Sequence, residues 1–520
     1  MNIFNNFELG HDQARHANDG ALWYYYLHGY GTREFASYDA FITSFPEFSR
    51  SKIAWYFLYD PPVHALITAA SYTVFGMNEF AARLPSQLLN IVGILFLFLL
   101  AKEFTSEKNA LLIAFLYGCI PLVFHLGRDA MIDSGAASFL IGWMYCSFFL
   151  AAKHERWKKY CCFFVGGIAL TLAILTKYTS VFFFVGFLTV YGTYIFWKIF
   201  KKKERVFSFE NKQVFFCVII QIGLLVVLSL PWISYSLFNG GVLEKLAPVR
   251  TENWTQHGYF YNVSYLFYEL IIESVGLFGF ILLLYFGRKA MQQKHAPLVS
   301  FVAAALLVVP LYFTNIQPRY FLAVFGFALI IIFLLLTNIF SEKTARRVVI
   351  GYLCIFVFIS ITLSYLVLQN NGLIDTSGFD TTFSAIQGQA LFFGYYGNFD
   401  TVDIVSGPHI LAVKSWWQYW NTENPYTNHY ANPDLFMFRF FQKLETHPDI
   451  GFVYLSAAEL QGEYGVDVLQ IMNSTKESIP TYFIVPNTNQ GEEYTSIEQF
   501  LAGVTTQKNS YIYWDFYEIR

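Results

Sequence analysis

The chain has 520 residues, of which 55% are hydrophobic, 20% aromatic and only 14% charged; its mean hydropathy is +0.40. Soluble domains carry about 25% charged residues, so this composition excludes an ordinary soluble protein and predicts an α-helical polytopic membrane protein. The net charge of −3 and the scattered basic residues argue against nucleic-acid binding.

The first 83 residues are too polar to cross a membrane, although residues 61–76 form an amphipathic segment suited to the membrane surface. We expect this region to be the first extracytoplasmic loop. Such a loop needs a span before it to cross the membrane, so we expect one N-terminal span to be missing from the sequence as given.

Ten apolar runs of spanning length follow. They are residues 84–101, 109–126, 131–152, 160–175, 178–197, 213–237, 264–286, 297–314, 320–340 and 348–368. If residues 1–83 lie outside, the inner loops hold 18 Lys and Arg residues, against five in the outer loops between spans. This bias matches the positive-inside rule and also places residues 369–520 outside.

Beyond residue 368 the composition changes. Strand-like runs at 452–455, 481–485 and 511–519 accompany a helical stretch at 496–504 and turn sequences. We expect three domains: an extracytoplasmic loop (1–83), a transmembrane domain (84–368) and a small extracytoplasmic α/β or α+β domain (369–520). All six cysteines fall in predicted spans, so we expect no disulfide.

Seven short motifs carry a resemblance to a known family. They are HDQARHANDG (11–20), DPP (60–62), FGMNEFAARLPS (75–86), GRDAMID (127–133), LAILTKYT (172–179), LPW (230–232) and QPRYFL (317–322). In this order the series resembles the C-type glycosyltransferases of the protein mannosyltransferase and aminoarabinose transferase group (families 39 and 83). These enzymes have 11 or more spans, which agrees with a missing N-terminal span.

The resemblance implies transfer of one sugar from a polyprenyl-phosphate donor to an acceptor, with Asp12 as the base that deprotonates the acceptor hydroxyl. Gln13 stands where the family has Glu and keeps hydrogen bonding without charge. From the residues alone, the alternative is a loop aspartate that caps a helix, since the segment also has the pattern of a helix start. We interpret His11, Arg15 and His16 as solvated loop residues.

The resemblance makes Asp133 a second acid that faces Asp12, with Arg128 and Asp129 as support. The structural alternative is an ion pair between Arg128 and Asp133.

The donor phosphate needs cations at the outer membrane surface. The expected ligands are Arg83, Lys177 and Arg319, with Tyr320 adding a hydrogen bond. Arg83 directly precedes an expected span, so the phosphate would lie near a helix N-terminus. The alternative for each cation is snorkelling to the membrane interface.

SWWQYWNTENP (415–425) resembles the WWDYG motif of oligosaccharyltransferases, with Gln418 in place of the Asp. Trp416 and Trp417 are therefore weak candidates for acceptor binding, beside a core role. No metal-ligand motif occurs, so we expect neither a metal nor another cofactor.

The sequence predicts a cell-membrane glycosyltransferase whose partners are the lipid-linked donor, membrane lipid and an extracytoplasmic protein, lipid or glycan acceptor. The enzymatic alternative transfers a lipid-linked oligosaccharide. A lipid-linked sugar flippase is the alternative of another class; it would favour inverted repeats and broken helices at mid-membrane, which the sequence does not show.

Overall fold

The computed structural model describes residues 11–30, 33–45, 53, 60–202, 209–238, 295–307, 318–370, 390–396, 433–444, 450–456, 481–486, 505–510 and 514–519. The chain divides into two compact units. Leu58–His64 and Arg83–Asn370 form one, called here the membrane unit. Met1–Phe57, Ala65–Ala82 and Asn371–Arg520 form the other, called here the terminal unit because it contains both chain ends. The domain boundaries expected from the sequence stay predictions.

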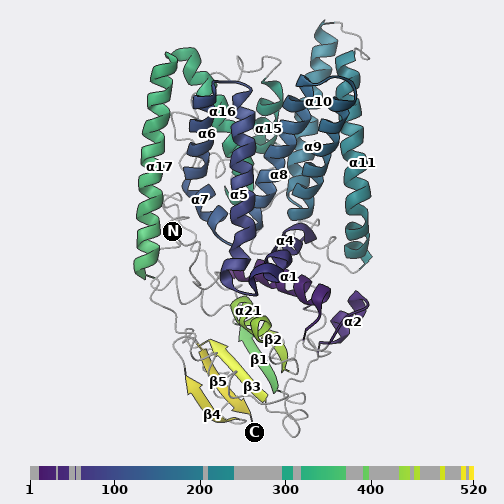
Figure 1. Cartoon of the computed structure of the whole chain (residues 1–520), viewed down its shortest axis with the longest axis vertical. Coiled ribbons are helices and arrows are strands. Elements are labelled where there is room, and N and C mark those ends of the chain that lie inside the picture. Colours follow the sequence, from purple (N-terminus) through teal and green to yellow (C-terminus); the bar gives the residue numbers. More distant parts are fainter. Residues whose placement is uncertain are drawn as a thin grey trace. The chain divides into compact units, whose positions relative to one another are not determined.

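Long helices that run side by side build the membrane unit (Figure 1). They are α5 (Glu79–Lys102), α6 (Glu107–Cys119), α7 (Pro121–Arg128), α8 (Ile132–Met144), α9 (Arg156–Thr176), α10 (Ser180–Lys202), α11 (Phe209–Phe238), α15 (Ala296–Leu307), α16 (Leu322–Ile339) and α17 (Glu342–Asn370). A π-helical turn (Tyr145–Leu150) and a 3₁₀ turn (Ala151–Lys153) extend α8, and a 3₁₀ turn, η6 (Pro318–Phe321), precedes α16.

Six helical segments in the described part of the chain are long and apolar enough to cross a membrane. They are Glu79–Lys102, Ile132–Lys153, Trp157–Thr176, Ser180–Trp197, Phe216–Ser234 and Arg319–Ile339. Each coincides with a span expected from the sequence, so the protein is a multi-pass membrane protein. The expected span 348–368 lies within α17, and α15 covers the first part of 297–314. The expected span 264–286 lies outside the described residues.

The span expected over 109–126 is broken in the structure. Two helices occupy this region, and they bend by 73° at a break between Cys119 and Leu122. Pro121 explains the break, because proline has no N–H to donate and its ring excludes the preceding residue from helical geometry. Ile120 accordingly has an extended ψ of 124°. Helix α7 therefore does not continue the direction of α6.

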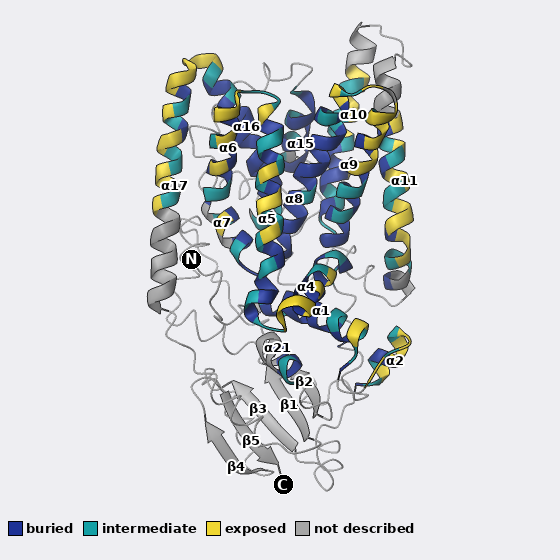
Figure 2. Cartoon of the chain, viewed as in Figure 1, coloured by how far each residue is buried: buried dark blue, intermediate teal, exposed yellow. Residues whose placement is uncertain are grey.

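Helices α8 and α16 form the centre of the membrane unit. In their apolar segments 78% and 83% of the residues are buried, against 17% in α11, and Figure 2 shows the same contrast between buried and exposed helices. The indole of Trp143 lies fully buried on α8, with Phe184, Phe187 and Phe301 in edge or tilted contacts. Aromatic contacts from α10 and α15 thus pack against α8, the helix that leads into the candidate site.

The terminal unit combines helices from the N-terminal region with a mixed sheet. Its helices are α1 (His11–His28), α2 (Tyr38–Thr43), α4 (Pro62–Phe75, whose first residues belong to the membrane unit) and α21 (Pro433–Leu444). Its strands are β1 (Ala390–Tyr396), β2 (Ile450–Ser456), β3 (Thr481–Pro486), β4 (Thr505–Ser510) and β5 (Trp514–Ile519).

The sheet has the order β2-β1-β3-β5-β4. Strand β1 is parallel to β2 and β3, whereas β5 is antiparallel to β3 and β4. Helix α21 lies between β1 and β2 in the sequence, as the connection of two parallel strands requires. Strands β2, β3 and β5 coincide with strand-like runs of the sequence, and the expected helix at 496–504 lies outside the described residues.

Hydrogen bonds join the two ends of the chain within the terminal unit. The Tyr25 hydroxyl on α1 donates to the carbonyl of Phe441 on α21, and the Gln442 amide donates to the Met77 carbonyl over 3.3 Å. The Tyr72 hydroxyl on α4 donates to the Ala17 carbonyl on α1 over 3.1 Å. Helices α1, α4 and α21 are therefore one packed layer.

Candidate functional site

An ion pair between α8 and the α9–α10 connection forms the centre of the candidate site in the membrane unit. Asp133 lies in the first turn of α8, where the helix dipole favours a carboxylate. Its Oδ1 atom lies 2.5 Å from Nζ of Lys177, and the exposed fractions of the two side chains are 1% and 13%. Lys177 follows α9 in an extended conformation (φ −151°, ψ 120°), which turns its side chain out of the helix.

Burial lowers the pKa of the Lys177 ammonium, the Asp133 carboxylate opposes this effect, and the positive charge of Arg319 adds to it. The ammonium of Lys177 also lies 4.1 Å from the ring centroid of Tyr320, a cation–π contact. The Arg319 guanidinium lies 5.8 Å from the same ring. The structure thus brings Asp133, Lys177, Arg319 and Tyr320 together from three distant segments, and Tyr320 presents its ring to Lys177.

The alternative ion pair between Arg128 and Asp133 is not what the structure shows, because Asp133 pairs with Lys177. Arg128 instead lies beside its neighbour, with Nε 3.7 Å from Oδ1 of Asp129. Both side chains lie in the turn between α7 and α8, and Asp129 is buried. They are close to the start of α8 in the chain, but they do not replace Lys177 as the partner of Asp133.

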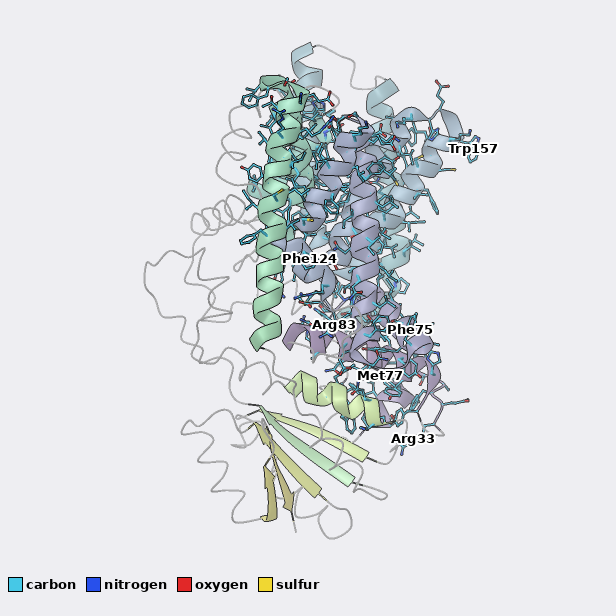
Figure 3. The ribbon with its side chains drawn as sticks, turned by 60° about the vertical axis from the view of Figure 1, so that its left-hand side comes forward. Arg33, Phe75, Met77, Arg83, Phe124 and Trp157 are labelled. Carbon is cyan, nitrogen blue, oxygen red and sulfur yellow. The ribbon has the colours of Figure 1, made fainter. Side chains whose placement is uncertain are left out.

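Arg83 lies inside a helix, so its expected position just before a helix N-terminus is wrong. Helix α5 already begins at Glu79, because the Asn78 side chain accepts a hydrogen bond from the Ala81 N–H over 2.9 Å and caps the helix. The hydropathy profile misses this polar first turn. Arg83 is 7% exposed and lies at one end of the membrane unit, with Trp157 at the other (Figure 3).

A second contact at this end escaped the sequence analysis. The indole N–H of Trp232 on α11 donates to the Tyr178 hydroxyl over 2.8 Å. Tyr178 directly follows Lys177, and the negative charge of Asp60 acts on both of these residues. Asp60, Tyr178 and Trp232 all belong to motifs quoted for the resemblance, but the spacing of the motifs does not show which of them meet.

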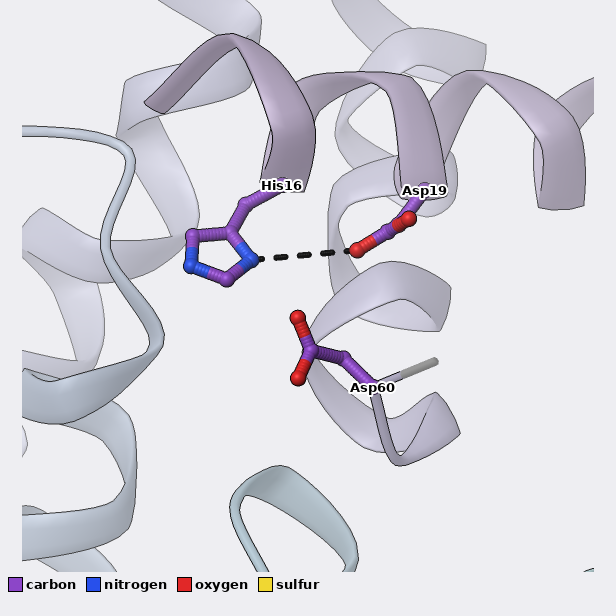
Figure 4. Close-up of side chains that lie close together, drawn as sticks. All are labelled: His16, Asp19 and Asp60. Atoms are coloured by element: carbon purple, nitrogen blue, oxygen red, sulfur yellow. Dashed lines mark ion pairs between the residues drawn. The ribbon is translucent and has the colours of Figure 1, made fainter. Parts of the chain in front are cut away.

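In the terminal unit, HDQARHANDG forms the first turns of α1. Asp12 therefore lies on a helix, in its first turn, and the position of its side chain lies outside the description. Gln13 is half-buried. His16 is buried rather than solvated: its Nδ1 lies 3.7 Å from Oδ2 of Asp19, one turn further along (Figure 4). Figure 4 also draws Asp60, a residue of the membrane unit.

Two buried carboxylates of the terminal unit, Asp19 and Glu79, also escaped the sequence analysis. Both act on the buried Tyr72 hydroxyl. Burial raises the pKa of Tyr72 well above its ordinary value, and the charges of Glu79 and Asp19 raise it further. Tyr72 is therefore a permanent hydrogen-bond donor, consistent with its bond to Ala17. The signal was present, since Asp19 and Glu79 stand inside the quoted motifs.

The remaining sequence-based candidates stay predictions. Trp416 and Trp417 lie outside the described residues, so an acceptor-binding role is neither supported nor opposed. The facing of Asp12 and Asp133 is also a prediction, because they belong to different units. The expectation that no metal is required also stays untested.

Residues 59–233 match the family model described as dolichyl-phosphate-mannose-protein mannosyltransferase. This segment contains Arg83, Asp133 and Lys177. An uncharacterised protein of Aquifex aeolicus (strain VF5) is 30% identical over 120 residues, a stretch that covers 23% of each of the two chains.

The chain is also similar to solved structures of ArnT from Cupriavidus metallidurans. The apo structure has a TM-score of 0.60 at 14% identity, with 99% of this chain and 95% of that chain covered. The structure bound to undecaprenyl phosphate has a TM-score of 0.56 at 13% identity, with the same coverage. The protein is thus a membrane protein with an ArnT-like fold. Together with the family match, this confirms the resemblance to C-type glycosyltransferases that the sequence motifs indicated.

Proposed function

We propose that the protein is a glycosyltransferase that transfers one sugar from a polyprenyl-phosphate donor to an extracytoplasmic acceptor. The match to a dolichyl-phosphate-mannose-dependent family and the fold shared with ArnT, one structure of which holds undecaprenyl phosphate, support a donor of this class. The sugar is a hexose or pentose, and the acceptor is a protein, a lipid or a glycan. The reaction inverts the anomeric carbon.

The observation that carries this proposal is the group formed by Lys177, Arg319 and Tyr320. Two cations share one aromatic ring at the ends of membrane helices, where a lipid phosphate lies when its chain is in the bilayer. Lysine supplies a point charge and arginine a planar fork of donors, and both suit phosphate oxygens. Arg83 is the third proposed phosphate ligand, now from the second turn of α5.

Asp133 holds Lys177 in place through the ion pair. Its other oxygen, Oδ2, accepts no hydrogen bond from the described part of the chain, so the carboxylate keeps an acceptor site. Asp12 is the proposed base: it takes the proton of the acceptor hydroxyl as the oxygen attacks the anomeric carbon, and the polyprenyl phosphate leaves. Gln13, Arg128 and Asp129 are proposed to support the site.

The test is a reconstituted assay of the purified full chain with polyprenyl-phosphate sugars, paired with mass analysis of cell-envelope glycans in a deletion strain. Arg319→Ala should weaken donor binding by about tenfold or more, since it removes a charged hydrogen-bond donor, while turnover at saturating donor changes less. Unchanged envelope glycans together with no transfer from any polyprenyl-phosphate sugar would contradict the proposal.

A further inference from the structure

Two buried side chains, His64 and Ser86, form hydrogen bonds that hold the turn before Asp133, and they are called the clamp here. This turn runs from Arg128, the last residue of α7, to Ile132, the first residue of α8. Met131 is extended (φ −119°, ψ 135°), and its N–H points back to the Asp129 carbonyl over 2.8 Å. The Met131 side chain makes no cap hydrogen bond at the start of α8.

The main partner is Ser86 on α5. Its hydroxyl donates to the Met131 carbonyl over 2.8 Å and accepts from the Met131 N–H over 3.1 Å. A serine hydroxyl has one hydrogen and two acceptor positions. The third contact lies 3.1 Å away, at Nε2 of His64. Because the single hydrogen of the hydroxyl already points to the Met131 carbonyl, His64 must be the donor in this contact. This assigns the tautomer of His64 with hydrogen on Nε2.

Both clamp residues are buried, His64 at 2% and Ser86 at 0% exposure. Gln87, the next residue on α5, donates to the Arg128 carbonyl at the other end of the turn over 3.3 Å. Polar side chains at positions 83, 86, 87 and 90 follow helical spacing on α5. The polar face of α5 thus forms hydrogen bonds with both ends of the turn, although α5 is otherwise an apolar membrane helix.

We propose that His64 and Ser86 are positioning residues that act through the Met131 backbone to hold Asp133 against Lys177. The clamp fixes the first residues of α8, and Asp133 is only two residues beyond Met131. Loss of the clamp lets α8 begin at a different residue, and a small shift there separates the ion pair. The structural step stands alone, and its consequence for turnover rests on the proposed function.

The first experiment needs no enzyme activity. The purified full chain is treated with acetic anhydride, which reacts with neutral amines, and labelling of Lys177 is followed by peptide mass spectrometry. Ser86→Ala and His64→Phe should speed Lys177 labelling by about tenfold, the factor associated with one lost hydrogen bond. Ser86→Thr and His64→Gln keep a hydroxyl and an N–H donor and should label at nearly the original rate.

Ser138→Ala is the matched control. Ser138 is also a buried serine of the membrane unit, but among the described residues its hydroxyl bonds within α8 alone, to the Ser134 carbonyl over 2.7 Å. It should leave Lys177 labelling unchanged. Equal labelling in Ser86→Ala, His64→Phe and the original protein would overturn the proposal. If Ser86→Ala does not fold, the comparison of His64→Phe with His64→Gln decides it in the same way.

The second experiment separates positioning from general stability through a double-mutant cycle on turnover. Ser86→Ala should lower kcat by about 10- to 100-fold, as expected for a small misplacement of site groups. In an Asp133→Asn background the same change should lower it less than about twofold, because coupled residues are not additive. Full additivity would overturn the proposal. A labelling change without any transferase activity would leave the clamp in place and contradict only the proposed function.

Discussion

At the scale of single residues, Lys177 contacts groups of the protein and is also a proposed ligand of the donor. In this structure its ammonium contacts the Asp133 carboxylate and the Tyr320 ring, and the proposed donor adds a phosphate. A buried lysine without a partner is costly, so Asp133 stabilises the charge before the donor arrives. The ion pair also fixes the Asp133 carboxylate beside Lys177, one of the proposed phosphate ligands.

The proposed role of Asp12 as the base leads to a direct test. Asp12→Asn should keep the fold and donor binding but lower turnover by about 100-fold or more, the usual loss when a general base is removed. Turnover and donor binding would be measured separately in a reconstituted assay. Gln13→Glu and Gln13→Asp serve as controls and should be tolerated. Near wild-type turnover of Asp12→Asn would move the chemistry to Asp133 or out of α1.

The pH dependence of donor use should report Lys177. Its pKa is lowered from the ordinary 10.5, mainly by burial, so the neutral amine appears at lower pH than in a free lysine. Phosphate binding needs the ammonium; kcat/KM for the donor is therefore retained below this pKa and lost as pH rises through it. Lys177→Arg keeps its charge at all accessible pH values and should move the alkaline limit upward. Identical alkaline limits of kcat/KM in the original protein and in Lys177→Arg would show that Lys177 does not set the limit.

At the scale of elements, the close approach of α5 and α7 depends on one glycine. A Cβ atom on Gly127 would lie 2.0 Å from Nδ2 and 2.5 Å from Cγ of Asn90. These distances are far below van der Waals contact, so a side chain at position 127 requires the Asn90 side chain or one of the two helices to shift. The turn that Ser86 and Gln87 hold starts at the next residue.

Gly127→Ala should therefore destabilise the protein by about 1 to 3 kcal/mol, the usual cost of overpacking. Thermal unfolding in detergent is the measurement. Asn90→Ala in the Gly127→Ala background removes the clashing amide and should recover most of the loss, whereas Asn90→Ala alone is the reference. If Gly127→Ala melts at the original temperature, the absence of a side chain at position 127 does not limit the approach of α5 and α7.

At the scale of the whole molecule, the positive-inside rule predicts which side of the membrane each end of the helices faces. In a cysteine-free background, Val74→Cys and Trp157→Cys place single thiols at exposed positions, 71% and 68% exposed in the native residues. A membrane-impermeant maleimide should label position 74 but not position 157 in intact cells, and both after permeabilisation. Labelling of position 157 in intact cells would reverse the orientation and place the site in the cytoplasm.

The sequence by itself determined the membrane class and most span positions. These features rest on composition, on apolar runs of bilayer length and on charge bias, all of which are local or additive along the chain. The sequence also contained Pro121, but its effect on the span over 109–126 was overlooked. The polar first turn of α5 was missed because hydropathy cannot distinguish it from a loop.

Only the tertiary structure decided which of these residues meet. Asp133 has Arg128 and Asp129 nearby in the sequence, yet it pairs with Lys177, 44 residues away. Helix packing brings the start of α8 beside the end of α9, and burial then requires the carboxylate and the ammonium to neutralise each other. The same packing gives Ser86 and His64 their common partner, Met131. Contacts between segments distant in the chain depend on the fold. The sequence therefore names candidate residues of the site but does not show which of them contact each other.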